Sequence, residues 1–561
     1  MLKKANGTRI PEERVISLRS CKIPRDFLYD GEKMGYTGDT ILFQRGGKRI
    51  MSDKPRRWKA VAVLDIGSSS VRMGVYQSGK NGTQRLELLE HPLRIGHEVF
   101  TSGRISVESV RRLSAILRGY SQVMKEYGVT EYRAIATTAL REARNRAYVV
   151  DQLKTQNNLV VEVLENGEES ALVYAALAGM PAVPAASLLA YIGTGSVGVA
   201  AWDGRIIQQT CNITIGFQKL GETLRSLEEQ TAGFCKALEE YVETYFRRLT
   251  LRLGERRFDA LTLTGRNLEV IAPLCGARLE NGVYRIEKKQ LEKLYDRIKG
   301  MHAPVAAQYL SISEGAAEQL LPMLALYLRM LDFTQASFMT APPVDIIDLL
   351  ADQMLYETKR REFETIQREG AVATAAEMAA RRMSDMAHAQ RVREYAVMLF
   401  GKLKKLHGVS GKRLVLLECA ALLHEVGYSA NAKDSGRSTY DAIKQAYLYG
   451  LSEEDTTLIG EIARYGDFIE TVTAGETLPE KQRLLVDKLA AMLVMADALD
   501  ESRRGKITGL KLRLEPDRLV VTASGREEPL LERWAFAECA PLFEDVFGIQ
   551  PVLVWKSELL A

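Results

Sequence analysis

The sequence has no run of 18 consecutive apolar residues and only six cysteines among its 561 residues. A membrane-spanning helix needs about 20 predominantly apolar residues in a row, so we expect no segment to cross a membrane. The opening residues, MLKKANGTRIPEERV, lack the apolar centre of a secretory signal. The cysteines lie far apart and form no Cys-x-x-Cys pair, which indicates free thiols and argues against a zinc site built on cysteine. These absences together predict a cytoplasmic protein.

The composition is typical of a folded globular protein of several domains. Hydrophobic residues make up 46% and charged residues 26% of the chain. A single core rarely grows beyond about 250–300 residues, so three or four domains are expected. The net charge of +4 is uneven, because residues 1–57 hold 14 Lys or Arg against 7 Asp or Glu. We predict a basic, poorly ordered extension there, and a solvated tail is favoured over an arm that binds polyanions.

Residues 58–185 alternate between strand and helix patterns, which is typical of an α/β domain. The segments KAVAVLDIG and VRMGVYQ indicate buried strands on either side of a polar turn. Ser106 begins a predicted helix with apolar residues at helical spacing, and Gly128 ends it. Strand, turn and strand return about 128 residues later in LLAYIGTGSVGVAAWDG. We therefore predict a second α/β domain over residues 186–348, with both polar hairpins facing a shared cleft.

The character of the chain changes after residue 348. Residues 349–507 carry almost only helical patterns rich in Ala, Glu and Arg, which predicts an all-helical domain. Residues 508–561 combine the strand pattern GLKLRLEPDRLVVTASG, a long helix and PVLVW. This last part is predicted to be a small α/β cap.

The first hairpin carries more polar groups than a structural turn needs. Gly67 allows a tight turn whose successive N–H groups can hold an anion. The hydroxyls of Ser68–Ser70 and the guanidinium of Arg72 add donors suited to phosphate. Asp65, at the end of a buried strand, is placed to hold a divalent cation through water. The alternative is an ordinary serine-rich hairpin with a capping aspartate.

Two further segments bring charged residues to predicted strand and helix ends. ATTALREARNR places Arg141 just after a strand, at the sheet edge where ligands gather in α/β proteins, although such arginines also occur on solvated surfaces. ENGEESALVY places Glu168 and Glu169 at a helix start, where they can also serve the helix dipole alone. On the residues alone, both interpretations stay open for each segment.

The segments LDIGSSSVR, ATTALREARN, ENGEESALVY, YIGTGSVGV and TIGFQKLGE, in this order, resemble the exopolyphosphatase and guanosine pentaphosphate phosphohydrolase family. The resemblance continues through RVREYAVMLFGKL, ALLHEVGYSAN and MADALDESRRGKI, which are similar to the HD-like helical domain of that family. It covers roughly residues 58–550. It implies two duplicated actin-like (ribonuclease H-like) α/β domains, an HD-like helical domain that mediates a homodimer, and no nucleic-acid or membrane partner.

The same resemblance implies a phosphohydrolase that releases terminal phosphate from inorganic polyphosphate or guanosine pentaphosphate. Glu169 would be the base that orients water, and Arg141 a clamp on the transferring phosphoryl group. Asp65 would position Mg²⁺, or Mn²⁺ in its place. The residues that would hold phosphate are Gly67, Ser68, Ser69, Ser70, Arg72, Gly193, Thr194, Gly195, Ser196 and Gly265.

The second hairpin departs from the family pattern, which usually reads Asp-Ile-Gly-Gly-Gly-Ser-Thr-Glu. This chain has Tyr191 in place of the aspartate and Gly198 in place of the glutamate. The third loop, LTLTGRN, keeps only Gly265 where several glycines are expected. These changes leave open a rival function, a relative that binds or senses polyphosphate or (p)ppGpp without hydrolysing it. An ATP-dependent kinase of the same superfold is a third alternative.

The helical domain raises the question of a second metal site. HD metal sites use an early His, a His-Asp pair and a distant Asp. In comparable places this chain has His388, then His424 followed by Glu425, and then Asp497. The histidines usual in the segment SANAKDSGRSTYDAI are missing. Satisfied polar groups of the core are therefore the favoured interpretation, with a bound metal as the alternative.

Overall fold

The computed structural model describes residues 59–558 except 81, 229–230, 254–255, 267, 383–384, 429–434 and 465–477. Ahead of residue 59 it describes four two-residue strands that pair as two hairpins: β1 (Tyr36–Thr37), β2 (Thr40–Ile41), β3 (Gln44–Arg45) and β4 (Lys48–Arg49). The rest of the predicted basic extension lies outside the described residues. Lys59–Ala561 form one compact unit, distinct from Met1–Trp58.

The first sheet of this unit has five strands in the order β7-β6-β5-β8-β9. Its strands are β5 (Ala60–Ile66), β6 (Ser70–Gly79), β7 (Gly82–Pro92), β8 (Glu131–Ala136) and β9 (Val161–Val163). All seven residues of β5 are buried, as expected for a central strand with the apolar sequence AVAVLDI. The helices are α1 (Ile95–Ser102), α2 (Val107–Glu126), α3 (Thr138–Glu142), α4 (Arg146–Asn157) and α5 (Asn166–Ala178).

Helix α2 begins and ends where the sequence predicts. The side chain of Ser106 accepts a hydrogen bond from the N–H of Ser109, which satisfies a donor of the first turn. Gly128, just beyond the helix, has φ of 63°, a left-handed conformation that glycine adopts without strain. Leu113 and Leu117 on the buried face of the helix belong to the core under the first sheet.

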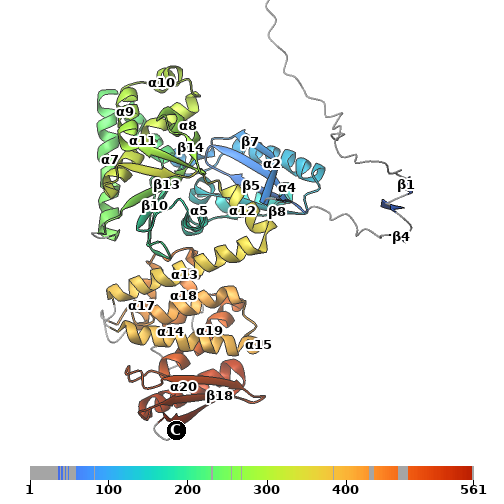
Figure 1. The fold of residues 1–561 in the computed structure, drawn as a ribbon, viewed down its shortest axis with the longest axis vertical. Coiled ribbons are helices and arrows are strands. Elements are labelled where there is room, and N and C mark those ends of the chain that lie inside the picture. Colours follow the sequence, from blue (N-terminus) through green and yellow to red (C-terminus); the bar gives the residue numbers. More distant parts are fainter. Residues whose placement is uncertain are drawn as a thin grey trace, which may run out of the picture. The chain divides into compact units, whose positions relative to one another are not determined.

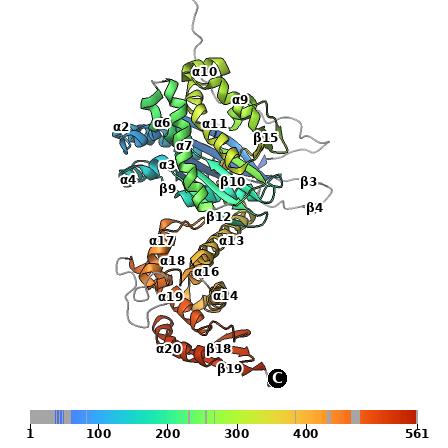
Figure 2. The same ribbon diagram turned by 90° about the vertical axis from the view of Figure 1, so that its left-hand side faces the viewer.

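The second sheet has seven strands in the order β12-β11-β10-β13-β16-β15-β14. They are β10 (Ser187–Ile192), β11 (Val197–Trp202), β12 (Ile207–Ile213), β13 (Ala260–Gly265), β14 (Leu279–Glu280), β15 (Val283–Glu287) and β16 (Phe338–Ala341). Its helices are α6 (Phe217–Glu228), α7 (Thr231–Leu253), α8 (Leu268–Leu274), α9 (Lys288–Ile298), α10 (Ala303–Leu310) and α11 (Glu314–Thr334). Helices α7 and α11 cover one face of the sheet and pack on the apolar residues of β10 (Figure 1, Figure 2).

Five neighbouring strands of the second sheet repeat the topology of the first. In each sheet, two successive antiparallel strands lie on one side of the central strand and a parallel strand lies on the other. Strands β10, β11 and β12 thus correspond to β5, β6 and β7. The internal repeat seen in the sequence is a repeat of structure.

Helix α12 (Ile346–Leu355) leaves the second sheet and returns to the first. Its buried residues Ile347 and Leu350 join the apolar cluster of Val61 and Val63 on β5. The domain boundary expected after residue 348 therefore falls inside a helix that packs on the first domain.

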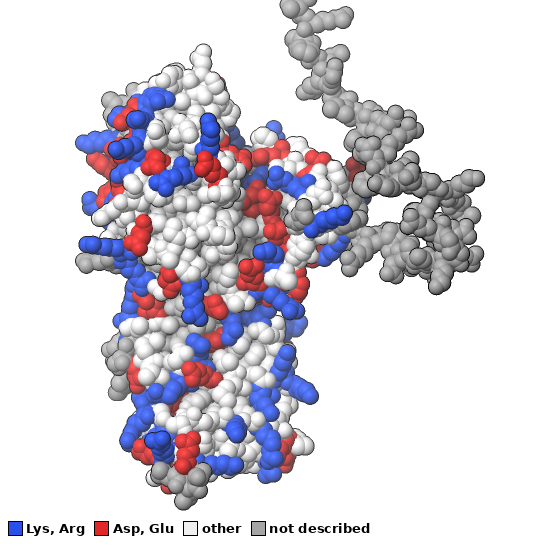
Figure 3. All heavy atoms as spheres, in the orientation of Figure 1, with Lys and Arg blue, Asp and Glu red and all other residues white. Residues whose placement is uncertain are grey.

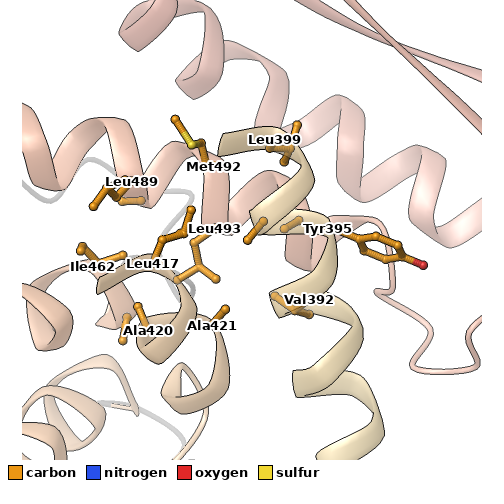
Figure 4. Close-up of a cluster of buried hydrophobic side chains, with 14 of the residues drawn as sticks. Val392, Tyr395, Leu399, Leu417, Ala420, Ala421, Ile462, Leu489, Met492 and Leu493 are labelled. Carbon is orange, nitrogen blue, oxygen red and sulfur yellow. The ribbon is translucent and has the colours of Figure 1, made fainter. Parts of the chain in front are cut away.

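The next part of the chain is helical. Its elements are α13 (Glu357–Arg382), α14 (Met386–Lys402), α15 (Lys404–His407), the 3-10 helix η1 (Gly411–Arg413), α16 (Leu414–Leu423), α17 (Ser435–Lys444), α18 (Glu453–Ala463) and α19 (Glu480–Ala498). Helices α14, α16 and α19 meet in one apolar core, in which Val392, Leu417 and Leu493 lie close together (Figure 4). This core fixes the three helices relative to one another.

The chain ends in a three-stranded sheet of order β17-β18-β19 with one helix. The elements are β17 (Gly509–Leu514), β18 (Arg518–Gly525), α20 (Leu530–Phe547) and β19 (Gln550–Ser557). Val521 of β18 and Phe543 of α20 belong to the same apolar cluster as α14, α16 and α19. The C-terminal sheet therefore extends the core of the helical part.

Two expectations from composition can be compared with the described residues. None of the helices described is both long enough and apolar enough to span a bilayer. The five described cysteines, Cys211, Cys235, Cys275, Cys419 and Cys539, are free thiols. On the face drawn in Figure 3, basic and acidic side chains are interspersed.

Candidate active site

The turns of the two repeated hairpins have the same geometry. In the first turn, the N–H of Gly67 donates to the carbonyl of Ser70 at 3.0 Å. In the second, the N–H of Gly193 donates to the carbonyl of Ser196 at 2.9 Å. Each turn therefore places its two middle residues just beyond the end of a central strand.

The two turns approach each other closely. Oγ of Ser68 in the first turn lies 3.0 Å from Oγ1 of Thr194 in the second. Gly195 lies so near Thr138 of the first domain that an added Cβ would come within 2.1 Å of its Cγ2 atom. Glycine is therefore required at this position for the two domains to meet as they do.

Residues of both turns line a cavity of about 340 Å³. Its lining includes nine of the residues predicted for the site: Asp65, Gly67, Ser68, Ser69, Arg72, Glu169, Gly193, Thr194 and Gly265. The structure therefore brings both hairpins, the third loop and Glu169 to one cavity. Four predicted residues do not line it but lie next to residues that do, namely Ser70, Arg141, Gly195 and Ser196.

Asp65 lines the cavity and is held by two arginines. Its side chain is only 4% exposed, and its Oδ2 atom lies 2.9 Å from Nη2 of Arg72 and 2.9 Å from Nη2 of Arg266. Arg72 also makes two hydrogen bonds to the carboxylate of Asp345, at 2.7 and 3.0 Å. Burial alone would lower the pKa of Arg72, but Asp65 and Asp345 raise it above its usual value. This arginine is therefore a fixed cation.

Arg266 and Asp345 were missed by sequence reasoning. Arg266 follows Gly265 at the end of β13 and reaches across to the first hairpin, where Nη1 lies 3.4 Å from Oγ of Ser69. Gly265 is needed because an added Cβ would come within 2.5 Å of the carbonyl oxygen of Ile192. The available signal was the position of Arg266, since polar residues at the carboxyl ends of parallel strands gather at ligand sites.

Glu169 lies in the first turn of α5, with one hydrogen bond to each carboxylate oxygen. Oε2 accepts from Nη1 of Arg141 at 3.1 Å, and Oε1 accepts from the hydroxyl of Tyr191 at 3.2 Å. Arg141 also donates to the carbonyl of Leu164 and to the side chain of Asn166. Its guanidinium is thus committed to partners behind Glu169. Arg141 does not line the cavity, whereas Arg72 does. This arrangement suits a residue that positions Glu169, and it does not fit the expected clamp on the phosphoryl group.

Tyr191 occupies the place where the family pattern has an aspartate. Burial, and then the charge of Glu169, raise the pKa of Tyr191 well above its usual value, so the phenol stays neutral. A neutral phenol can donate a hydrogen bond to Glu169, which a carboxylate cannot do. Where the family pattern has an aspartate, this chain therefore has a hydrogen-bond donor to Glu169.

Gly198 occupies the place of the family's glutamate, and other side chains fill the space beside it. An added Cβ would lie 2.3 Å from the hydroxyl of Tyr174 and 2.6 Å from Oδ1 of Asn212. Asn212 in turn donates to the hydroxyl of Tyr447, in the helical part, at 2.7 Å. The helical part therefore reaches the back of the second hairpin.

Asp65 and Glu169, the two carboxylates that the sequence predicted for this site, do not fit a resident Mg²⁺ or Mn²⁺ ion. Mg²⁺ is usually held by one or two carboxylates that remain available to it, together with water and substrate phosphate. Here Asp65 carries two arginine contacts and Glu169 carries one, while the second hairpin offers Tyr191 and Gly198 in place of acids. Arg72 and Arg266 occupy the carboxylate of Asp65, which was the residue predicted to position the metal.

The structure brings together three of the four residues predicted for the HD-like site. One ligand atom from each of His388, His424 and Asp497 lies within 4.8 Å of the others. Glu425 does not join them, because its carboxylate forms an ion pair with Arg503, with Nη1 3.1 Å from Oε2. Glu425 is thus paired with Arg503 and lies apart from the cluster of the other three residues.

Comparisons with known proteins agree with this architecture. The model of the Ppx/GppA phosphatase family matches residues 75–343, and the model of Ppx/GppA phosphatase domain III matches residues 372–532. A guanosine-5'-triphosphate,3'-diphosphate pyrophosphatase of Photobacterium profundum is 22% identical over 446 residues, which cover 77% of this chain and 84% of the relative. Exopolyphosphatase 1 of Mycobacterium bovis is 25% identical over 118 residues, covering 21% of this chain and 34% of the relative.

Two solved structures each align with 53% of this chain. The Ppx/GppA family member of Aquifex aeolicus aligns with a TM-score of 0.46 at 19% identity, over 53% of this chain and 97% of its own. An exopolyphosphatase of Cytophaga hutchinsonii aligns with a TM-score of 0.47 at 17% identity, over 53% of this chain and 99% of its own.

Two sheets that share a five-stranded topology, with hairpin turns that meet at a cavity, define a protein of two repeated α/β domains. The family models match both this part and the helical part that follows. The chain belongs to the Ppx/GppA phosphatase family.

Proposed function

We propose that this protein is a phosphohydrolase that releases the terminal phosphate of inorganic polyphosphate or of guanosine pentaphosphate. The observation that carries the proposal is the position of Glu169, a buried carboxylate that lines the same cavity as both polar hairpin turns. The names of the relatives, a guanosine pentaphosphate pyrophosphatase and an exopolyphosphatase, support the same class of reaction.

In the proposed reaction, Glu169 orients a water molecule and accepts its proton. Each of its oxygens accepts one hydrogen bond from the protein, which leaves lone pairs for the water. The water oxygen forms a bond to the terminal phosphorus, and the bond from that phosphorus to the bridging oxygen breaks. The electron pair of the broken bond leaves with the shortened phosphate chain. Tyr191 and Arg141 fix the direction of the carboxylate during this step.

The charge on the phosphate is balanced by arginines in this proposal. Arg72 and Arg266 present guanidinium groups at the first hairpin, and Ser68 and Thr194 add hydroxyl donors from the two sides. Planar guanidinium groups match the geometry of phosphate oxygens. Phosphoryl transfer depends mainly on positioning and electrostatic stabilisation, so these groups supply what the reaction requires.

Phosphate release by the purified full-length chain tests the proposal, with polyphosphate and guanosine pentaphosphate as substrates. Glu169→Gln should lower the rate about 10²–10⁴-fold, the range that general base catalysis contributes. Glu168→Gln is the matched control, because this neighbour caps the same helix through the N–H of Glu165 and glutamine can keep that contact. Equal rates for wild type and Glu169→Gln would contradict the role of Glu169.

A second candidate function is binding without hydrolysis, and the arginine contacts of Asp65 favour it. A site with Tyr191 and Gly198 in place of two acids can hold an anion without activating water. Tight binding of either substrate by wild type without phosphate release would select this function. The substrate that binds more tightly would then identify the ligand that is sensed.

The helical part does not indicate whether the substrate is a long or a short anion. A cavity of about 820 Å³ is lined by residues of the first α/β domain and of the helical part, including Arg133, Arg360, Arg361, Arg368, Lys412 and Arg413. Each of these six cations makes an ion pair with a carboxylate. The charges there are compensated. The expected homodimer and cytoplasmic location stay predictions.

A further inference from the structure

The segment Tyr447–Leu451, between α17 and α18 of the helical part, contacts the beginning of α5, where the proposed base stands. Tyr449 of this segment is fully buried, and its hydroxyl donates to the carbonyl oxygen of Ala171 in α5 at 3.1 Å. Gly167, on the other side of the base along the chain, lies against the same segment. An added Cβ at Gly167 would lie 3.0 Å from the carbonyl oxygen of Leu451. The helix that carries the base is therefore held by the helical part.

Two hydrogen bonds in succession join the residue after Glu169 to this segment. The hydroxyl of Ser170 donates to Oδ1 of Asn212 at 3.3 Å. Nδ2 of Asn212, on β12, donates to the hydroxyl of Tyr447 at 2.7 Å. Ser170 is only 5% exposed, so the first bond lies in a low-dielectric environment, where hydrogen bonds are stronger than in water. One side chain of the second sheet thus bridges α5 and the helical part.

This bridge depends on the glycine at position 198. Gly198 is paired with Asn212 in the register of β11 and β12. An added Cβ would lie 2.6 Å from Oδ1 of Asn212 and 3.1 Å from Oγ of Ser170, so even the smallest side chain would press on both atoms of the first hydrogen bond. The glutamate that the family pattern has at this position would displace them. The bridge therefore belongs to this chain's own form of the second hairpin.

The segment itself is fixed by α13. The N–H of Tyr449 donates to Oγ1 of Thr374 at 3.2 Å, and the side chain of Gln367 donates to the carbonyl oxygen of Gly450. Gly450 has φ of 69°, a left-handed conformation that favours glycine. Gly370 of α13 leaves room for the ring of Tyr449, because an added Cβ would lie 2.4 Å from that ring. The contacts of the segment with α5 therefore rest on a rigid support.

We propose that Asn212 and Tyr447 are positioning residues for Glu169. They act through Ser170, the next residue of α5, so that the helical part completes the active site of the α/β domains. Neither Asn212 nor Tyr447 lines the phosphate cavity, so neither is placed to bind substrate. A shift of about 1 Å in a catalytic group can lower a rate about 10²-fold, so a loosened α5 should reduce turnover. This assignment rests on the proposed role of Glu169 as the base.

Steady-state phosphate release by the full-length chain tests the proposal, with polyphosphate and guanosine pentaphosphate as substrates. Tyr447→Phe removes only the hydroxyl and should lower the turnover number about threefold to tenfold, the effect of one hydrogen bond. Asn212→Ala removes both hydrogen bonds and should lower the turnover number at least as much. The Michaelis constant should stay unchanged in both variants, because the residues that line the cavity are intact.

Tyr395→Phe is the matched control. The hydroxyl of Tyr395 donates to the carbonyl oxygen of Ile507 at 3.1 Å, and both residues lie outside the α/β domains. This variant loses a comparable hydrogen bond, so its midpoint of thermal unfolding should fall about as much as that of Tyr447→Phe, while its turnover number stays at the wild-type value. A loss of turnover in the control would show that lower stability alone explains the effect, and it would overturn the proposal.

The decisive measurement combines Tyr447→Phe with Glu169→Gln. If the tyrosine acts through the glutamate, its loss should cost the double variant no further turnover compared with Glu169→Gln alone. An equal loss in both backgrounds would overturn the proposal and leave Tyr447 a purely structural residue, while the role of Glu169 would stand. Unchanged turnover in Tyr447→Phe would overturn the positioning role in the same way. A full rate in Glu169→Gln alone would instead contradict the proposed function, and the positioning role with it.

Discussion

The two hairpins of this protein share one backbone and differ in chemistry. The next-to-last register pairs before the turns are equivalent, Asp65 with Arg72 in the first hairpin and Tyr191 with Gly198 in the second. The first pair is ionic. The second pair is neutral, and its Tyr191 donates a hydrogen bond to Glu169. In the proposed reaction the duplicated fold thus separates two tasks, with one hairpin binding charge and the other positioning Glu169. Four substitutions test this division, in decreasing order of expected effect.

Arg72→Gly gives the first hairpin the residue that the second hairpin has at the equivalent position, Gly198, and should have the largest effect. It leaves the carboxylate of Asp345 without its arginine and removes one of the two cations on Asp65. Breaking a largely buried ion pair costs about 3–5 kcal/mol of unfolding free energy, which denaturant unfolding of the intact chain would measure. The control, Arg85→Gly, removes an exposed pair with Asp348 and should cost no more than about 1 kcal/mol for that pair. A similar loss in both variants would contradict the ionic role of the first hairpin.

Arg266→Gln removes the cation that the second domain contributes to the first hairpin. Hydrogen bonds to charged groups contribute about 1.5–3 kcal/mol, so phosphate release should fall roughly 10–100-fold. Wild type should keep most of its activity after chelation of divalent ions, whereas Arg266→Gln should depend more on added Mg²⁺. Arg278→Gln, at an exposed arginine of the same domain, is the control. Full inactivation of wild type by chelation alone would show that the arginines do not replace the metal.

Gly198→Ala tests whether the second hairpin has lost the room for a side chain. The new Cβ would meet the hydroxyl of Tyr174 and the side chain of Asn212 well inside contact distance. Overpacking of this kind costs about 1–3 kcal/mol, and a lower midpoint of thermal unfolding would report it. Gly119→Ala, in α2, is the control because an added Cβ there meets nothing within 4 Å. An unchanged midpoint for Gly198→Ala would indicate that the space is still open.

Tyr191→Phe should have the smallest effect, since it removes one hydrogen bond and keeps the shape of the ring. A hydrogen bond of this kind contributes about 0.5–1.5 kcal/mol, so the turnover number should fall about threefold to tenfold. The Michaelis constant should change little, because Tyr191 contacts Glu169 and belongs to the hairpin that does not carry the phosphate cations. A rise in the Michaelis constant at constant turnover would assign Tyr191 to substrate binding.

Much of the architecture could be predicted because local patterns determine it. The strand, turn and strand of each hairpin, the helix from Ser106 to Gly128 and the helical part after α12 all follow from apolar periodicity and turn residues. The boundary after residue 348 could not be placed correctly, because α12 continues the sequence of the second domain and packs on the first. Which sheet a helix covers depends on the path of the chain in space.

The sequence by itself determined the repeat, the two polar turns and the presence of Glu169 at a helix start. Only the tertiary structure decided what these groups do, because their partners come from distant segments. Arg266 reaches Asp65 across 201 residues, and Asp345 reaches Arg72 across 273. The site of His388 and His424 likewise exists only where three helices pack together. Charge compensation depends on distances of a few ångströms, and such distances are set by folding.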